Sequence, residues 1–202
     1  MFPCLINHLS LVLRLYQLVR CITLRQLATV ITRSHDFTVS SGRAKGYKVA
    51  IAEQMEDPKQ AKGLVKREVI RVVTPGTLTN SQVLEESKNN YLMGIVYIDG
   101  VFGVSTVDVS TGDYLVTEVR NERSLLDEIY KFSPSELICN EAFYMSGIDL
   151  EDLKVRLNAV ISALENRFFS DDSCRRILRE HFHVEHLEAL GLADYETGAI
   201  AA

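Results

Sequence analysis

The chain has 202 residues, of which 47% are apolar and 24% are charged, a balance typical of globular proteins and unlike that of disordered chains. Its net charge of -5 is uneven, because residues 1–50 carry seven Lys or Arg and one Asp, whereas the remainder carries 15 basic and 26 acidic residues. An acidic surface repels phosphates, so we expect weak, salt-sensitive DNA binding at most and a protein partner instead. No run of 18 uninterrupted apolar residues is present, which excludes an ordinary transmembrane helix.

The cysteines exclude two common kinds of site. They lie far apart with no CxxC pair, so neither a zinc knuckle nor a thioredoxin-like redox site is predicted. Reduced thiols in the cytoplasm are the simplest interpretation of this spacing. The four residues are Cys4, Cys21, Cys139 and Cys174.

Residues 1–45 are basic and poor in acids, unlike everything that follows them. A loose spacing of apolar residues between Leu9 and Arg20 favours a short helix, which we expect to be followed by a disordered link. The same composition is typical of targeting peptides, which is a second interpretation. The abrupt change at Gly46 suggests either an out-of-frame start or a divergent one.

From Gly46 the pattern becomes regular. Two β-rich runs, Tyr47–Ala52 and Lys66–Thr74, predict strands, and Pro58 between them breaks any long helix. Pro75-Gly76 predicts a turn in which the glycine takes a positive φ. We place a domain boundary at this turn.

The residues after the boundary predict a second domain. Three strands are separated by an Asp99-Gly100 hairpin and by a turn at Ser110–Asp113, and a helix, a strand and more helices follow. A meander followed by a helix–strand unit is the ribonuclease-H-like arrangement, a mixed sheet with helices on its faces. The predicted strands are Leu92–Ile98, Val101–Val109, Tyr114–Val119 and Glu136–Cys139. The predicted helices are Glu122–Phe132, Leu150–Leu157, Asp171–Phe182 with Ser170 as its cap, and a helical turn at Leu187–Leu190, while Val160–Phe169 is compatible with strand or helix.

Two features of the meander are compatible with chemistry, and each also has a structural interpretation. Asp99 and Asp108 can hold metal ions, as in metal-dependent nucleases, or serve only the turns beside them. The turn at Asp108–Gly112 can cradle a phosphate with its backbone N–H groups, or be only a hairpin. No GxxxxGK[ST] or GxSxG motif occurs, so neither a P-loop nor a serine hydrolase is predicted.

Two clusters of side chains are further candidates. Three histidines in HFHVEH can bind zinc, although their spacing matches no metal motif. A basic stripe ahead of the domain boundary can contact the DNA backbone or form a solvated edge. The histidines are His181, His183 and His186, and the candidate DNA-backbone contacts are Lys59, Lys62, Lys66 and Arg67.

One long block supports a specific resemblance. Residues 46–77 read GYKVAIAEQMEDPKQAKGLVKREVIRVVTPGT, which closely resembles the end of the mismatch-recognition domain in the MutS family of DNA mismatch-repair proteins. Phe102-Gly103 and Asp108–Gly112 resemble the connector domain of that family, whose fold is ribonuclease-H-like. GLADYETGAIAA at residues 191–202 resembles the passage into its core helical domain.

The resemblance implies an α/β chain in which a ribonuclease-H-like mixed sheet follows a partial α/β mismatch-recognition domain. Residues 1–45 are then an atypical start, 46–77 a remnant of the recognition domain and 78–192 the connector. Residues 193–202 begin a core helical domain that we expect to be cut short. The Phe-x-Glu motif that wedges against a mispaired base in the family does not occur in residues 1–45, and the sequence lacks the P-loop of the family's ATPase domain.

The resemblance also implies a function. Intact members of the family act as homodimers that bind mismatched duplex DNA, use ATP and Mg²⁺, and recruit MutL. We therefore expect a cytoplasmic repair-protein fragment that is no enzyme, has no cofactor or metal of its own, and retains the connector that relays signals and contacts MutL. The alternatives are a stand-alone ribonuclease-H-like, metal-dependent nuclease or an interaction module.

Overall fold

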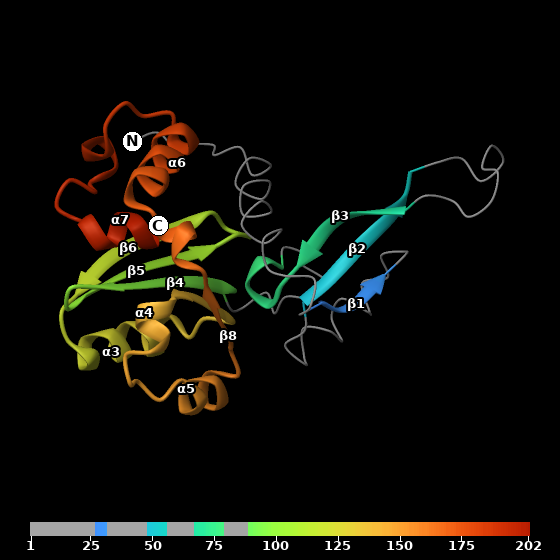
Figure 1. Ribbon diagram of the computed structural model, residues 1–202, viewed down its shortest axis with the longest axis horizontal. Helices are drawn as coiled ribbons and strands as arrows, with labels where there is room; N and C mark the ends of the chain where they lie inside the picture. Colours follow the sequence, from blue (N-terminus) through green and yellow to red (C-terminus); the bar gives the residue numbers. More distant parts are fainter. Residues whose placement is uncertain (1–26, 32–47, 56–66, 79–88) are drawn as a thin grey trace.

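The computed structural model describes residues 27–31, 48–55, 67–78 and 89–202, which form two sheets (Figure 1). The smaller sheet has the order β1-β2-β3, with β1 parallel to β2 and β2 antiparallel to β3. Its strands are β1 (Leu27–Ile31), β2 (Lys48–Gln54) and β3 (Arg67–Val73). The strands predicted over Tyr47–Ala52 and Lys66–Thr74 are thereby confirmed, with shifts of one or two residues at their ends.

The strand β1 corrects the prediction for residues 1–45. We expected a disordered link after the short helix, whereas residues 27–31 pair in parallel with β2. Their sequence, LATVI, contains three β-branched residues that favour an extended backbone, and β2 supplies the hydrogen bonds that an isolated segment lacks. The helix predicted between Leu9 and Arg20 lies outside the described residues.

A short 3-10 helix, η2 (Pro75–Thr77), connects the two sheets at the predicted turn. Gly76 does not have the positive φ that we predicted. Glycine is required there by close packing instead, because a Cβ at Gly76 would lie 3.0 Å from the Cβ atoms of both Glu136 and Leu92. The chain therefore passes directly against the larger sheet at this point.

The larger sheet has five strands in the order β6-β5-β4-β7-β8. The first three strands form an antiparallel meander, and β7 and β8 are added in parallel beside β4, so the predicted ribonuclease-H-like mixed sheet is confirmed. Asp99 and Gly100 both have positive φ, as expected for the predicted two-residue hairpin. The strands are β4 (Tyr91–Ile98), β5 (Val101–Asp108), β6 (Asp113–Val119), β7 (Glu136–Asn140) and β8 (Val160–Leu164).

One face of this sheet is covered by α3 (Glu122–Phe132), α4 (Glu141–Tyr144) and α5 (Leu150–Leu157) (Figure 1). These helices and the strands share one core, which includes Ile95, Ile129, Phe143 and Leu153. Both α3 and α5 have the predicted bounds. The single turn α4 was not predicted, because a four-residue helix is too short to show a hydrophobic period.

The other face carries η3 (Asn166–Phe169), α6 (Asp171–Phe182), η4 (Leu187–Leu190) and α7 (Glu196–Ala201). The segment Val160–Phe169, which the sequence left open between strand and helix, is the strand β8 as far as Leu164 and then turns into η3. Ser170 stands at the cap of α6 as predicted, but its side chain makes no capping hydrogen bond. Acids in the first turn, Asp171 and Asp172, favour the start of the helix electrostatically.

The residues expected to begin a further helical domain form α7, which packs closely on β5. A Cβ at Gly103 would lie only 2.2 Å from the carbonyl oxygen of Thr197, so the helix sits directly on the strand backbone. The hydroxyl of Ser105 donates to the carbonyl oxygen of Ala201 at 2.6 Å, and the carboxylate of Glu118 accepts from the backbone N–H of Gly198 at 2.8 Å. In the described part of the chain, no helix is long and apolar enough to cross a membrane.

The close approach of α7 predicts a large cost for a single methyl group. Gly103→Ala should lower the free energy of unfolding by about 3 kcal/mol, because backbone rather than a flexible side chain must move. Gly147→Ala is the control, since Gly147 has a positive φ but open space around it, and should cost about 1 kcal/mol of backbone strain. Urea denaturation measures both values, and equal losses would contradict the packing of α7.

Candidate functional site at the joint between the two sheets

Buried polar side chains gather at one end of the larger sheet. The strands β4, β7 and β8 are parallel, and their register places Leu92, Glu136 and Val160 side by side at the end where these strands begin. This is the end that faces β2 and β3 (Figure 1). The contacts between the two sheets are therefore made where polar backbone groups and side chains of several strands meet.

Glu136, the first residue of β7, is the central buried group, with 1% of its surface exposed. Its carboxylate accepts a hydrogen bond from the backbone N–H of Gly76 at 3.2 Å and one from the side chain of Thr74. Burial raises the pKa of Glu136, and the bonds from Thr74 and Gly76 and the charge of Lys48 oppose that rise. The connecting segment between the sheets is thus fastened to the start of β7.

Lys48, the first residue of β2, is the second charged member, with 6% of its surface exposed. Its ammonium group donates to the hydroxyl of Ser162 in β8 at 3.2 Å. Burial lowers the pKa of Lys48, and the nearby negative charge of Glu136 opposes that fall. We define the joint as Lys48, Thr74, Gly76, Glu136 and Ser162.

Asn90 extends the polar contacts beyond the joint. Its side-chain N–H₂ donates to the carbonyl oxygen of Pro75 at 2.9 Å, and its side-chain oxygen accepts from the hydroxyl of Ser135 at 2.7 Å. Its backbone N–H donates to Asp108 at 2.9 Å. The buried side chain of Asn90 thus links η2 to the residue before β7, and its backbone N–H reaches the end of β5.

The two aspartates considered as metal ligands lie at opposite ends of β5. Asp99 is in the β4–β5 hairpin and Asp108 is the last residue of β5, so roughly 30 Å of extended strand separates them. Two-metal sites require ligands around ions that are about 4 Å apart. Residues 27–31, 48–55, 67–78 and 89–202 contain no group of three or more His, Cys, Asp or Glu arranged to hold a metal ion.

Asp108 has a structural role instead, because residues of the turn that follows it donate hydrogen bonds to its buried carboxylate. One oxygen accepts from the backbone N–H and hydroxyl of Ser110, at 2.8 and 2.6 Å, and from the N–H of Thr111 at 3.4 Å. The other oxygen accepts from Asn90. The N–H groups that would cradle a phosphate in this turn are therefore engaged within the protein, and the phosphate-binding interpretation does not fit.

The three histidines lie around the end of α6 and are spread over different elements. His181 is in the last turn of the helix, His183 ends it with a positive φ, and His186 precedes η4. The ring of His181 packs edge-on against Phe182, with ring centroids 4.7 Å apart. All three histidines lie in the described region that contains no metal-binding cluster.

The described cysteines are free thiols in protected surroundings. Burial raises the pKa of Cys139 to about 12 and that of Cys174 to about 11, so both stay protonated at neutral pH and are poor nucleophiles. Cys4 and Cys21 lie outside the described residues.

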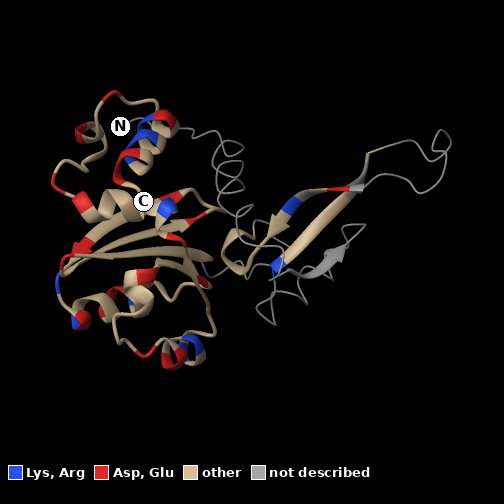
Figure 2. Cartoon of the chain, viewed as in Figure 1, with Lys and Arg blue, Asp and Glu red and all other residues tan. Residues whose placement is uncertain are grey.

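The candidate DNA-backbone contacts stay a prediction. Lys59, Lys62 and Lys66 lie outside the described residues, and Arg67 begins β3 opposite Gln54. On the larger domain, Figure 2 shows acidic and basic residues interspersed along α5 and α6. Several of them are paired within one helix, including Arg156 with Asp152 and Arg176 with Glu180, so these helices form no basic surface suited to DNA.

The joint was not predicted from the sequence. Lys48 stands in the run YKVAIA, where the alternation of residues marks a strand but gives a lysine no special place. Glu136 starts the short run ELIC, in which only the apolar residues signal burial. The one available signal was that each of two mostly apolar strands contains a charged residue, which needs a partner if it is buried.

Comparison with protein families divides the chain at the same place as the structure. The family model described as MutS domain I matches residues 23–82, and the one described as MutS domain II matches residues 90–202. The first match extends the resemblance that began at Gly46 back to residue 23, and so includes β1. The polar joint therefore lies where the two family domains meet.

Proteins named DNA mismatch repair protein MutS are similar over most of this chain. The relative from Lachnoclostridium phytofermentans is 57% identical over 158 residues, which are 78% of this chain and 17% of the relative. Those from Acetivibrio thermocellus and Methanococcoides burtonii are 46% and 42% identical, over 74% and 78% of this chain and 18% of each relative. The chain thus spans less than a fifth of the length of these relatives.

Among solved structures, Thermus thermophilus RuvC is similar to part of the chain. The similarity covers 55% of this chain and 88% of RuvC, with a TM-score of 0.40 and 12% identity. Likeness at this level adds nothing to the strand order described above.

The role of Asp108 predicts a loss of stability when its charge is removed. In Asp108→Asn, an N–H₂ group replaces an oxygen that accepts backbone N–H bonds, so the free energy of unfolding should fall by about 2 kcal/mol. Asp113→Asn, at an exposed residue of the same turn, is the control and should change stability by less than about 0.5 kcal/mol. Mg²⁺-dependent DNA nicking that Asp108→Asn abolishes without loss of stability would contradict this structural role.

Proposed function

This chain belongs to the MutS family of DNA mismatch-repair proteins, and we propose that it supplies the first two domains of that system as one mechanically connected unit. The observation that carries the proposal is the order of the two matches, domain I at residues 23–82 and domain II at 90–202, with the buried joint between them. We use "domain I" and "connector" for these two segments.

In this proposal domain I faces DNA and the connector faces proteins. Domain I holds the candidate DNA-backbone contacts Lys59, Lys62, Lys66 and Arg67, which suit phosphates by charge. The chain after residue 77 carries 22 acidic and 10 basic residues, which disfavours DNA and favours a protein partner, for which we propose MutL. Recognition of mismatched duplex DNA and homodimer formation belong to the intact protein, acting in the cytoplasm.

We propose that the chain is not itself an enzyme. ATP and Mg²⁺ serve the intact family, but the residues present do not fit a nucleotide. The sequence has no GxxxxGK[ST] motif, and the turn amides at Ser110 and Thr111 already bond to Asp108. We therefore propose that this chain binds MutL and passes movements of domain I to the connector.

A competition experiment tests the proposal. Purified chain should bind MutL and, in excess, reduce the complex between MutL and a full-length MutS relative, while hydrolysing no ATP itself. At physiological salt it should bind heteroduplex and homoduplex DNA equally weakly, since the acidic connector opposes phosphate binding. An unrelated protein of similar net charge is the control for non-specific competition.

Two outcomes of that experiment would contradict the proposal. One is undiminished MutS–MutL complex at a large excess of folded chain. The other is sub-micromolar, mismatch-selective DNA binding or ATP hydrolysis by the chain alone, measured against a preparation free of contaminating ATPase.

A further inference from the structure

We propose that Lys48 and Glu136 are positioning residues that fix domain I on the connector, so that a displacement of domain I is passed to the starts of β7 and β8. The relay in this inference rests on the proposed function, whereas the contacts that make the joint rigid involve no partner. The joint would then act as the mechanical link between the part of the chain that faces DNA and the part that faces proteins.

Glu136 ties the connecting segment to the middle of the larger sheet. It accepts from Gly76 and Thr74, which lie in the segment between β3 and β4, and it starts β7, which pairs with both β4 and β8. Any rotation of domain I about residues 74–77 therefore pulls on a strand inside the sheet. A link to an inner strand is stiffer than a link to a loop, because the strand is held by ladders on both sides.

Lys48 provides a second point of attachment from a different strand. It starts β2 and reaches Ser162 on β8, the strand beyond β7. The two attachments involve β2 on one side and the segment after β3 on the other, and they end on neighbouring strands β7 and β8. A second, separate point removes every rotation of domain I except the one about the line that joins the two points, and the bond from Asn90 to the Pro75 carbonyl oxygen adds a further contact.

The charges make the joint resist partial opening. Both groups are buried, and the cost of burial is opposed at Glu136 by the bond from Thr74, the charge of Lys48 and the bond from Gly76, and at Lys48 by the charge of Glu136. Moving domain I by a few ångströms would leave both groups buried and poorly paired, which is costlier than either the closed or the fully hydrated state. The closed arrangement is therefore a defined state rather than one of many similar ones.

Close backbone packing supports the same conclusion. The missing Cβ of Gly76 allows the segment to lie against Glu136 and Leu92, where a methyl group would be 3.0 Å from each Cβ. Asn90 holds the neighbouring Pro75 carbonyl and, through Asp108, contacts the β5–β6 turn. A shift of residues 75–76 thus reaches three strands of the connector.

Distances between labels on the two domains test the inference. Spin labels carried by an unnatural amino acid at Met55 and Val155, which are 53% and 81% exposed, leave the native cysteines in place. The wild-type protein should give one narrow distance distribution. Glu136→Ala and Lys48→Met should each widen it at least about twofold, because each removes one attachment of domain I and leaves the other buried charge less compensated.

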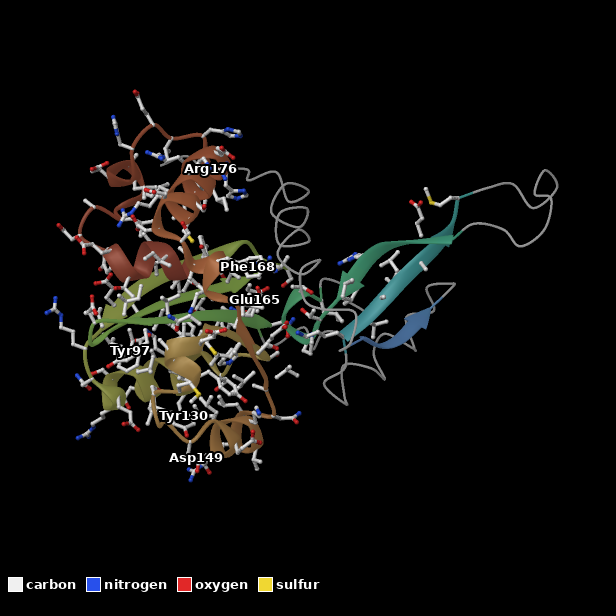
Figure 3. The ribbon with its side chains drawn as sticks, viewed as in Figure 1. Tyr97, Tyr130, Asp149, Glu165, Phe168 and Arg176 are labelled. Carbon is white, nitrogen blue, oxygen red and sulfur yellow. The ribbon has the colours of Figure 1, made fainter. Side chains whose placement is uncertain are left out.

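Matched controls remove exposed charges of the same kind. Glu165→Ala, at the residue after β8 that Figure 3 labels, and Lys131→Met on α3 remove side chains whose ion pairs lie at the surface. Both should leave the distribution as narrow as in the wild type. A general loss of stability cannot produce the expected pattern, because circular dichroism on the same samples selects variants that remain folded.

A double variant separates positioning from simple structural support. Lys48→Met combined with Glu136→Gln removes both charges and keeps an oxygen to accept from Gly76, so its distribution should be narrower than that of either single variant. If Glu136→Ala does not fold, Lys48→Met and the double variant still give this comparison. Narrow distributions in folded Glu136→Ala and Lys48→Met, or no recovery in the double variant, would overturn the inference.

The result is independent of the proposed function. Wider distance distributions in the variants together with failure of MutL competition would reject the proposed function and support the role of the joint. Unchanged distributions with successful MutL competition would reject the joint alone.

Discussion

A carboxylate that is taken out of water must be met by donors and by an opposite charge, and this requirement organises the contact between the two sheets. Glu136 is met by the N–H of Gly76, by the side chain of Thr74 and by the charge of Lys48. Removing a group that compensates a buried charge is costly, because the remaining charge stays out of water with less to offset it. The contact of η2 with the start of β7 and the burial of the lysine that starts β2 both centre on this one group.

The protein contains a second buried carboxylate that is satisfied in a different way. Asp108 takes its bonds from Ser110 and Thr111, the residues of its own turn, and from Asn90. It therefore stabilises the connector from within, whereas Glu136 depends on residues from outside the sheet. The need of a buried carboxylate for donors thus closes a hairpin at Asp108 and joins two domains at Glu136. Asn90 bonds both to Asp108 and to Pro75 in the connecting segment.

Local signals predicted most of the connector, and they failed where distant residues decide the structure. The bounds of Glu122–Phe132, Leu150–Leu157 and Asp171–Phe182 were predicted correctly, and each of these helices has acids in its first turn and basic residues in its last turn, which favour a helix at that place. The joint depends on pairs that are 60 and 114 residues apart, and no local pattern brings Glu136 to Gly76 or Lys48 to Ser162. The strand β1 was missed for a similar reason, since its partner β2 is separated from it in the sequence by residues 32–47.

The most direct test of the account is whether the two domains tumble as one body. At 22.7 kDa the chain is suited to ¹⁵N relaxation measurements of backbone amides in solution. We predict the same rotational correlation time for the amides of β2 and β3 as for those of β4 to β8, because the joint holds them in one orientation. A clearly shorter correlation time for β2 and β3 would show a hinge at residues 74–77 and would contradict the account.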